Sequence, residues 1–362
     1  MRIDFIISSL QGGGAERVMV IMSEYLSSIG YDVRIIIFSD VVKYQLPEEI
    51  ALIVLDTKSA QNHLLRSVIN LRKYYKIKDN RPNIMVSFIT KNNLIAILVS
   101  KMLAIPLLAC EHSNFFRNQS PVFLSKITKT FFYRFADQIT VLTTFDLPYY
   151  KKYGIDVKVL PNPSTFKPTS NTKNKREKII LAVGGLDRYH IKGFDNLLEV
   201  MAPILKSNKE WKLKFVGGGE KGKVFLSQMA EDKGITENVI FTGFREDVAN
   251  IMKESNIFVL SSRIEGMPMV LLEAMSQGMA CIAYNCKTGP SDIIESNFDG
   301  LLIEDQNIEA MRAGLQLLID EEALRNKLRS NAVKSVSKFS IQSIGDKWIK
   351  LLDDVVSKKR KE

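Results

Sequence analysis

Two glutamates, Glu265 and Glu273, are the side chains whose types and spacing point most directly to chemistry. Glu265 follows an apolar run at 257–260, and Gly266 and Pro268 behind it are typical of a tight turn that opens a helix. An ionised carboxylate accepts several hydrogen bonds, so the pair could bind vicinal hydroxyls of a sugar and of a ribose. A capping glutamate and an exposed helix glutamate are the alternative, but the strand and turn around them favour a binding site.

A glycine run, Gly12, Gly13 and Gly14, separates an apolar run at 3–9 from a helical pattern. Glycines let the backbone approach a ligand, and a helix N-terminus offers free N–H groups, so a phosphate, carboxylate or acceptor site is expected here. A glycine turn without a ligand has the same pattern. Arg17 stands where the dinucleotide fingerprint needs its third glycine, which argues against NAD.

A second glycine run at 217–222 matches G-x-G-x-x-G and also follows an apolar run. Thr242 occupies the position where the fingerprint expects a ribose-binding acid, about 20 residues on. We therefore do not interpret this run as an NAD site, although its backbone could line a nucleotide site.

Three further polar side chains lie where ligands bind in α/β proteins. His112 follows the apolar run at 107–110, at a strand end, although a lone histidine is more often structural. Arg188 and Lys192 belong to a basic loop beside Gly184 and could hold a diphosphate through charge-assisted hydrogen bonds. A charged loop is usually only solvated, so this interpretation depends on its neighbours.

The segment 122–135 combines large apolar residues with Lys126, Lys129 and Arg134. This composition suits a helix at a membrane interface. A packed helix whose basic side chains extend to water has the same composition, and the sequence leaves both open.

No Asp-x-Asp, Walker A or G-x-S-x-G pattern occurs, and the three cysteines lack metal-ligand spacing. We therefore expect neither a metal nor a cofactor. Three cysteines form no disulfide framework, which fits a reducing, cytoplasmic setting. No run approaches the roughly 20 apolar residues of a membrane-spanning helix, and no signal peptide is expected.

Short apolar runs alternate with helical patterns, which predicts an α/β protein with doubly wound parallel sheets. The runs lie at 3–9, 33–38, 84–88, 107–110, 138–142, 157–160, 179–183, 213–216, 239–241, 257–260 and 281–283. Helices are expected at 16–29, 93–103, 196–205 and 341–356.

A polar stretch interrupts this rhythm, so we expect two Rossmann-like domains facing a central cleft. The predicted N-terminal domain is 1–165, the linker 166–178 and the C-terminal domain 179–340. The last segment, 341–362, is expected to cross back onto the first domain.

The 362 residues carry a formal net charge of +10, and 46% are hydrophobic, which excludes disorder and coiled coil as overall classes. Residues 1–170 hold 21 Lys+Arg against 13 Asp+Glu, so most of the excess lies in the first half. Nucleic acid, an anionic membrane or a phosphorylated substrate would each suit that charge.

Several motifs in fixed order resemble the family 4 retaining glycosyltransferases, which have the GT-B fold. They are Gly-Gly-Gly-Ala-Glu-Arg at 12–17, Val-Gly-Gly-Leu at 183–186 with Lys-Gly-Phe at 192–194, Phe-Val-Gly-Gly-Gly at 215–219, Phe-Thr-Gly-Phe at 241–244, Glu-x(7)-Glu at 265–273 and Gly-Pro-Ser-Asp at 289–292. The resemblance spans nearly the whole chain. It is specific for the family and says little about the sugar.

The resemblance implies a role for each matching position. His112 and Glu265 would act at the transferred sugar, and Gly12, Gly13 and Arg17 would lie near the acceptor. The implied donor-binding residues are Gly14, Gly184, Arg188, Lys192, Gly243, Phe244, Glu265, Gly266, Met267, Pro268, Met269 and Glu273. The family usually has arginine where this chain has Gly185, so Arg188 is expected to substitute for it.

From this resemblance we expect transfer of a hexose or N-acetylhexosamine from a UDP-linked or related nucleotide sugar. The expected acceptor is a lipid-linked saccharide or oligosaccharide of surface polysaccharide or glycan assembly, at the inner face of the cell membrane. A nucleotide-sugar epimerase or a phosphorylase of the same fold is the alternative. A basic nucleic-acid-binding protein is a further alternative, which the absence of any nucleic-acid motif disfavours.

Overall fold

The computed structural model describes residues 1–56, 62–116, 121–170 and 175–359. The chain divides into two compact units, Met1–Pro163 with Ile341–Glu362, and Ser164–Ser340. We call these the first and second unit. Residues 171–174 of the predicted linker and residues 360–362 of the C-terminal segment lie outside the described residues.

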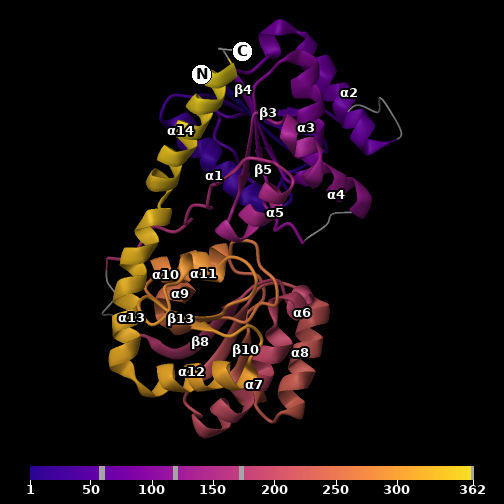
Figure 1. The fold of residues 1–362 in the computed structure, drawn as a ribbon. Coiled ribbons are helices and arrows are strands. Elements are labelled where there is room, and N and C mark those ends of the chain that lie inside the picture. The colour runs from indigo at the N-terminus through magenta and orange to yellow at the C-terminus, as the bar shows by residue number, and fades with distance from the viewer. Residues whose placement is uncertain (57–61, 117–120, 171–174, 360–362) are drawn as a thin grey trace. The chain divides into compact units, whose positions relative to one another are not determined.

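The first unit is built on a parallel sheet (Figure 1). Its described strands pair in the order β3-β2-β1-β4-β5-β6-β7. Such strands are apolar throughout because helices cover both faces of the sheet, and every residue of β4 and β5 is buried. The strands are β1 (Arg2–Ile7), β2 (Asp32–Ile37), β3 (Ala51–Val54), β4 (Ile84–Phe88), β5 (Leu107–Cys110), β6 (Gln138–Val141) and β7 (Val157–Val159).

Helices connect these strands as expected of a doubly wound fold. They are α1 (Gly14–Ser28), α2 (His63–Lys76), α3 (Thr90–Leu103), α4 (Val122–Thr130) and α5 (Leu147–Lys152), with short 3₁₀ turns η1 (Lys78–Asn80), η2 (Phe132–Phe135) and η3 (Thr144–Asp146). The last helix, α14 (Ile341–Lys359), also belongs to this unit. Its Gly345 lies against the Tyr25 ring of α1, where a Cβ would overlap that ring. Its buried Trp348 packs against Phe5 and Phe88, at 5.9 and 6.0 Å between ring centroids.

The second unit has a parallel sheet of its own, in which the described strands pair in the order β10-β9-β8-β11-β12-β13. They are β8 (Glu177–Val183), β9 (Lys212–Val216), β10 (Val239–Phe241), β11 (Ser255–Leu260), β12 (Ala280–Tyr284) and β13 (Leu301–Ile303). The helices are α6 (Tyr189–Lys192), α7 (Phe194–Ser207), α8 (Glu220–Asp232), α9 (Val248–Glu254), α10 (Met269–Ser276), α11 (Pro290–Ile293), α12 (Ile308–Asp320) and α13 (Glu322–Ser335). The short turns are η4 (Leu186–Arg188), η5 (Thr236–Asn238) and η6 (Val336–Phe339).

The predicted α/β class with two parallel-sheet domains is confirmed. In each unit the strand order reverses at one point, between β1 and β4 in the first and between β8 and β11 in the second. Ligands of open α/β sheets bind at the carboxyl ends of the strands that flank this point. The segments after β1 and β4, and those after β8 and β11, are therefore where sites are expected, and the segment after β5 lies next to that after β4.

Three details differ from the sequence-based expectation. Strands β3 and β13 were not predicted, because both are short, lie at a sheet edge and have mostly exposed or partly buried residues. The segment 122–135 is not one helix: α4 ends at Thr130 and a 3₁₀ turn follows Phe131. Lys129 is not a surface cation, since it is fully buried. Within the described residues, no helix has both the length and the apolar character needed to span a bilayer.

Candidate functional site

In the second unit, Lys192 and Glu265 meet beside the ends of β8 and β11. The Lys192 ammonium lies 2.8 Å from Glu265 Oε1, and both side chains are largely buried. The Ser262 hydroxyl donates to the same oxygen over 2.7 Å, and the Thr288 hydroxyl donates to the Glu265 carbonyl. These contacts fix the carboxylate in place at the point where the strand order reverses.

Gly184 provides the space that Lys192 needs. A Cβ at Gly184 would stand 3.3 Å from three carbons of the Lys192 side chain, a distance that would force the lysine to move. The lysine stem therefore lies across the glycine and directs its charge to Glu265. The close contact with Lys192 explains why a glycine stands at position 184, directly after β8.

Arg263 is a residue of this region to which the sequence analysis gave no role. Its guanidinium binds Asp195 in a bidentate pair at 2.7 and 3.0 Å, and it donates to Asn196 over 2.6 Å. It also donates to the carbonyl of His190, so it ties α6 and the start of α7 to the segment that carries Glu265. Burial raises the pKa of Asp195, but the hydrogen bonds from Arg263, the Asn196 amide and His190, together with the positive charge of Arg263, outweigh this and hold the pKa below its usual value.

Arg188 has the opposite character. It is exposed at the end of η4, and its guanidinium makes no hydrogen bond or ion pair with the residues that the structure describes. Gly185, where the family usually has arginine, is exposed as well. A cation in this state is available to an anionic ligand at no cost to existing contacts.

The turn between β11 and α10 depends on a tight glycine contact. A Cβ on Gly289, whose φ is +96°, would lie 2.5 Å from the Gly266 carbonyl oxygen and 2.6 Å from Pro268 Cδ. Pro268 precedes α10, and Met267 is buried beside it. The turn therefore directs the backbone N–H groups at the start of α10, from Met269 onward, toward this edge of the sheet.

Glu273 is not an exposed helix glutamate. It lies in the second turn of α10 with 2% of its surface exposed, and its carboxylate accepts a hydrogen bond from the Thr165 hydroxyl. The alternative interpretation, in which Glu273 is a solvent-exposed helix glutamate, is therefore wrong. A buried carboxylate that binds a hydroxyl already shows the kind of contact that a ribose would make.

The second glycine run packs against the loop after β8. A Cβ at Gly217 would overlap the Gly184 carbonyl, and one at Gly222 would overlap the Leu186 carbonyl. The Asp187 carboxylate accepts a hydrogen bond from the Gly222 amide over 2.9 Å. The G-x-G-x-x-G match thus has a packing explanation that involves no NAD.

The loop after β10 continues the same row. The Gly217 amide donates to the Gly243 carbonyl over 2.9 Å, and the Phe244 ring is 77% exposed. A Cβ on Gly218 would lie 3.7 Å from Phe244 Cβ. The ring thus stands beside the glycine run, where a flat group could stack on it.

In the first unit, the glycine run opens α1 as expected, with Gly12 at a φ of +106°. The Gly13 amide is already occupied, because it donates to the Glu16 carboxylate. A Cβ on Gly14 would meet no atom within 4 Å, and Arg17 is half-buried. An anion that binds the Gly13 amide would therefore have to displace the Glu16 carboxylate.

His112 follows β5 and stacks on Phe88, with 4.0 Å between ring centroids. Burial lowers the pKa of His112 to about 3, so its imidazole is neutral at pH 7. A neutral ring can donate from one nitrogen and accept at the other, which suits contact with sugar hydroxyls. We call residues 111–116 the His112 loop.

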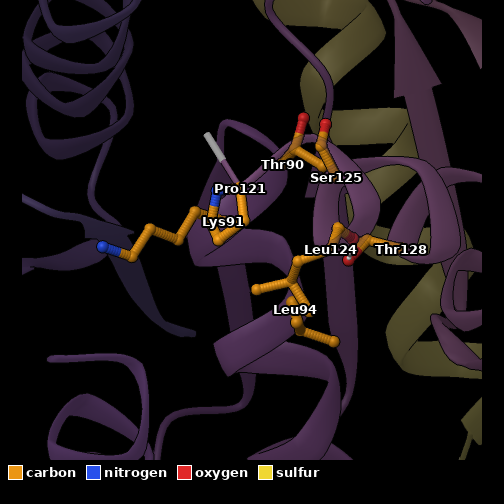
Figure 2. Close-up of a pocket in the computed structure, with 7 residues that line it drawn as sticks. All are labelled: Thr90, Lys91, Leu94, Pro121, Leu124, Ser125 and Thr128. Atoms are coloured by element: carbon orange, nitrogen blue, oxygen red, sulfur yellow. Dashed lines mark hydrogen bonds between the residues drawn. The ribbon is translucent and has the colours of Figure 1, made fainter. Parts of the chain in front are cut away.

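A small pocket lies between α3 and α4 (Figure 2). Leu94, Leu124 and Pro121 contribute most of its apolar lining, and Lys91 extends away from the other labelled side chains. The Thr90 hydroxyl at its edge already donates to Glu111. No candidate residue from the sequence lies in this pocket. Over the described ranges, no group of three or more His, Cys, Asp or Glu side chains is placed to hold a metal ion.

Family models match two consecutive parts of the chain. The model described as Glycosyltransferase Family 4 matches residues 12–163, and the one described as Glycosyl transferases group 1 matches residues 164–335. An uncharacterized glycosyltransferase of Haemophilus influenzae is 30% identical over 95% of this chain and 97% of its own length. The chain belongs to this glycosyltransferase family. The enzyme class expected from the motifs is confirmed.

A second relative of this glycosyltransferase comes from Campylobacter jejuni. It is 29% identical over 98% of this chain and 99% of its own length. Its name describes an α-1,4-N-acetyl-D-galactosaminyltransferase that acts on a saccharide linked to undecaprenol through a diphosphate.

Solved structures show the same fold. A sucrose-phosphate synthase of Thermosynechococcus elongatus matches with a TM-score of 0.84 at 17% identity, over 98% of this chain and 99% of its own. HepE of Anabaena, solved in complex with UDP-glucose, matches with a TM-score of 0.78 at 17% identity, over 98% of this chain and 100% of its own. The glycosyltransferase therefore has the GT-B fold that the motifs predicted.

Proposed function

We propose that this glycosyltransferase moves a hexose or N-acetylhexosamine from a UDP-linked sugar to a lipid-linked saccharide. The reaction retains the anomeric configuration and serves surface polysaccharide or glycan assembly. The observation that carries the proposal is the Lys192–Glu265 ion pair beside the ends of β8 and β11. Arg188 precedes Lys192 in the same loop, and its guanidinium has no ion-pair partner among the described residues. The Campylobacter relative supports the choice of acceptor through its name, and HepE supports a UDP-sugar donor.

The donor half of the proposal follows from charge. Breaking the anomeric bond leaves negative charge on the departing diphosphate, which positioned cations and helix N–H groups stabilise. Arg188, Lys192 and the N-terminus of α10 supply such groups, so the proposed reaction needs no metal. Glu265 binds sugar hydroxyls and Glu273 the ribose, while the Phe244 loop binds the base.

The acceptor half is assigned to the first unit. Gly12, Gly13 and Arg17 contact the acceptor, and the neutral His112 ring positions the transferred sugar. A neutral imidazole favours this role because it can exchange hydrogen bonds with hydroxyls without adding a charge.

A screen of nucleotide sugars tests the donor assignment. UDP-galactose, UDP-N-acetylgalactosamine and UDP-N-acetylglucosamine are compared with GDP-linked sugars by thermal shift, followed by assays of UDP release. We expect Glu265→Gln to lower the rate by about 100-fold or more while the melting temperature stays close to that of the wild type. Glu309→Gln, at an exposed position of α12, is the matched control. Full activity of Glu265→Gln would refute the role given to that residue.

We further propose that the acceptor reaches the first unit at an anionic membrane surface. Four apolar side chains of α4 and the following turn point outward: Val122, Phe123, Phe131 and Phe135 are 57%, 76%, 43% and 38% exposed. Arg134 lies 4.9 Å over the Phe131 ring. Exposed aromatic side chains beside cations are typical of an interfacial helix, and this favours the membrane reading of the segment over a packed helix.

Vesicle sedimentation tests the membrane proposal. The protein should bind vesicles of phosphatidylcholine with phosphatidylglycerol more tightly than vesicles of phosphatidylcholine alone, and Phe123→Ser should weaken that binding. Val224→Ser, a change of an exposed apolar residue in the second unit, is the control. Equal turnover of soluble and lipid-linked acceptors, with no affinity for anionic vesicles, would refute the proposal.

A further inference from the structure

Three buried ionisable side chains bind the backbone of the His112 loop. Glu111, Lys129 and Asp146 are 1%, 0% and 3% exposed, and each binds a backbone group of the loop. They come from the loop itself, from α4 and from η3, so three separate segments converge on it.

Glu111 anchors the start of the loop. One of its oxygens accepts hydrogen bonds from the amide and the hydroxyl of Ser113, at 3.1 and 2.8 Å. The other accepts from the hydroxyls of Thr90 and Tyr133, both at 2.6 Å. Thr90 begins α3 one residue after the end of β4, so Glu111 ties the loop to the neighbouring strand end.

Lys129 and Asp146 hold the next two peptide groups. The Lys129 ammonium donates to the Asn114 carbonyl over 3.3 Å, and the Phe115 amide donates to Asp146 Oδ1 over 2.9 Å. Asp146 also accepts from the Thr143 hydroxyl over 3.2 Å. The backbone groups of three successive residues after His112 are thus each bound by an ionisable side chain.

Stability alone does not explain this arrangement. Burying an ion costs several kcal/mol before its partners compensate, and apolar residues of similar volume often stabilise a fold as well or better. Directional hydrogen bonds to a loop backbone instead restrict it to one conformation. The residue whose position this fixes is His112, whose ring rests on Phe88 at the head of the loop.

We propose that Glu111, Lys129 and Asp146 are positioning residues for the glycosyl transfer, which hold the His112 loop so that the His112 ring stays on Phe88. The inference rests on the role given to His112 under the proposed function. It predicts that these residues act on the reaction through His112 and not through the stability of the unit.

Histidine NMR gives a readout that does not depend on activity. The chain has only three histidines, so selective labelling resolves the His112 ring. In the wild type the ring should stay neutral between about pH 5.5 and about pH 8, the range in which an ordinary histidine becomes protonated. In Lys129→Met and Asp146→Ala the ring should leave Phe88 and begin to titrate, with a pKa nearer to about 6.5. Asp146→Asn keeps an acceptor for the Phe115 amide and should restore the wild-type behaviour.

A matched control separates positioning from general destabilisation. Asp4 is fully buried and binds Arg34 over 2.7 Å on β1 and β2, within the same unit. Asp4→Asn should lower the melting temperature without moving the His112 signals. Unchanged His112 signals in both Lys129→Met and Asp146→Ala would overturn the proposal.

A double-mutant cycle tests the link to the reaction. With the nucleotide sugar chosen by the donor screen, Lys129→Met and Asp146→Ala should each lower kcat by about 10- to 100-fold, with a smaller effect on KM. In a His112→Ala background the same changes should add less than about twofold. Effects that multiply with His112→Ala, or full activity of His112→Ala itself, would overturn the positioning role. Absence of transfer by the wild type with every nucleotide sugar would instead contradict the proposed function.

Discussion

At the scale of the residue, the two donor-side cations differ in what they already bind. Lys192 is paired with Glu265 and lies over Gly184, so it contributes to local structure as well as to charge. Arg188 is exposed and makes no contact of this kind with the described part of the chain. Replacing Arg188 should therefore affect ligand binding and leave the fold intact.

Arg188→Ala tests this difference. The change removes a cation from the proposed diphosphate site, and a charge-assisted hydrogen bond is worth about 1.5–3 kcal/mol, so UDP affinity should fall by about tenfold or more. The melting temperature without ligand should stay at the wild-type value. Calorimetric titration with UDP measures the affinity, and Arg312→Ala on α12 serves as the control. Unchanged UDP affinity would mean that Arg188 does not replace the arginine missing at Gly185.

The pH dependence of stability should reveal Asp146. Burial raises the pKa of this carboxyl from 3.8 to about 6. The folded protein holds the proton more tightly than the unfolded chain, so this group stabilises the fold at low pH and loses that contribution as pH rises through about 6. The free energy of unfolding of the wild type minus that of Asp146→Asn should fall by up to about 3 kcal/mol between about pH 4 and about pH 6.5. Denaturant titrations measure it, and a difference that stays constant or rises would contradict the assignment.

Single residues were predictable from sequence where a turn or strand end marks them. Glu265 and Lys192 were selected in this way, and the structure shows them in contact. Arg263 and Glu111 could not be selected, because their function depends on partners such as Asp195 and Tyr133 that the fold brings together. The sequence does not show whether a charged residue beside a motif is buried or exposed.

At the scale of the element, glycines set how closely the loops after β8, β9 and β10 can approach. The Leu186 amide donates to the Gly218 carbonyl over 2.7 Å, and the Gly217 amide donates to the Gly243 carbonyl. Backbone contacts this close leave no room for side chains between them. The row therefore holds η4, with Arg188 at its end, against the start of α8.

Gly222→Ala tests this packing. Its Cβ would overlap the Leu186 carbonyl, so the change should destabilise the second unit by about 1–3 kcal/mol and weaken UDP binding. Gly218→Ala is the matched control, since its Cβ meets nothing closer than 3.7 Å and should shift stability by less than about 0.5 kcal/mol. Thermal unfolding with and without UDP measures both. Equal melting temperatures for the two variants would refute the packing argument.

Elements were predictable from apolar runs where strands are buried on both faces, as in β4 and β5. The edge strands β3 and β13 have few buried residues, so their patterns were too weak to detect. Apolar content alone also failed to show where α4 ends, because large apolar residues continue at 131–135 while the backbone of Phe131 leaves the helix.

At the scale of the whole molecule, the last helix belongs to the first unit although the second unit lies between them in sequence. Its amphipathic spacing predicted a packed helix, but not the contact of Trp348 with Phe5 and Phe88. Phe88 in turn carries the His112 ring. The C-terminal helix is thus two contacts away from the predicted sugar-binding histidine.

Trp348→Ala should lower the thermal stability of the first unit without changing UDP binding by the second. Loss of a buried tryptophan costs about 3–5 kcal/mol, and here the cost falls on the first unit. The unfolding transition of the first unit should move to lower temperature. UDP affinity, which is assigned to the second unit, should stay within about twofold of the wild-type value. Lys350→Ala, at an exposed position of the same helix, is the control. A large loss of UDP affinity in Trp348→Ala would contradict this division of roles.

The excess positive charge lies in the first half of the chain, on the unit to which the acceptor is assigned. The central claim is that a lipid diphosphate saccharide is the anion that this unit receives. Mass spectrometry of the product tests it, with UDP-galactose or UDP-N-acetylgalactosamine as donor and a polyprenyl-diphosphate-linked saccharide as acceptor. The account predicts an acceptor heavier by one hexose or N-acetylhexosamine, with UDP released only when donor and acceptor are both present. A rearranged sugar nucleotide formed without acceptor, or an unmodified lipid-linked saccharide with every donor, would contradict it.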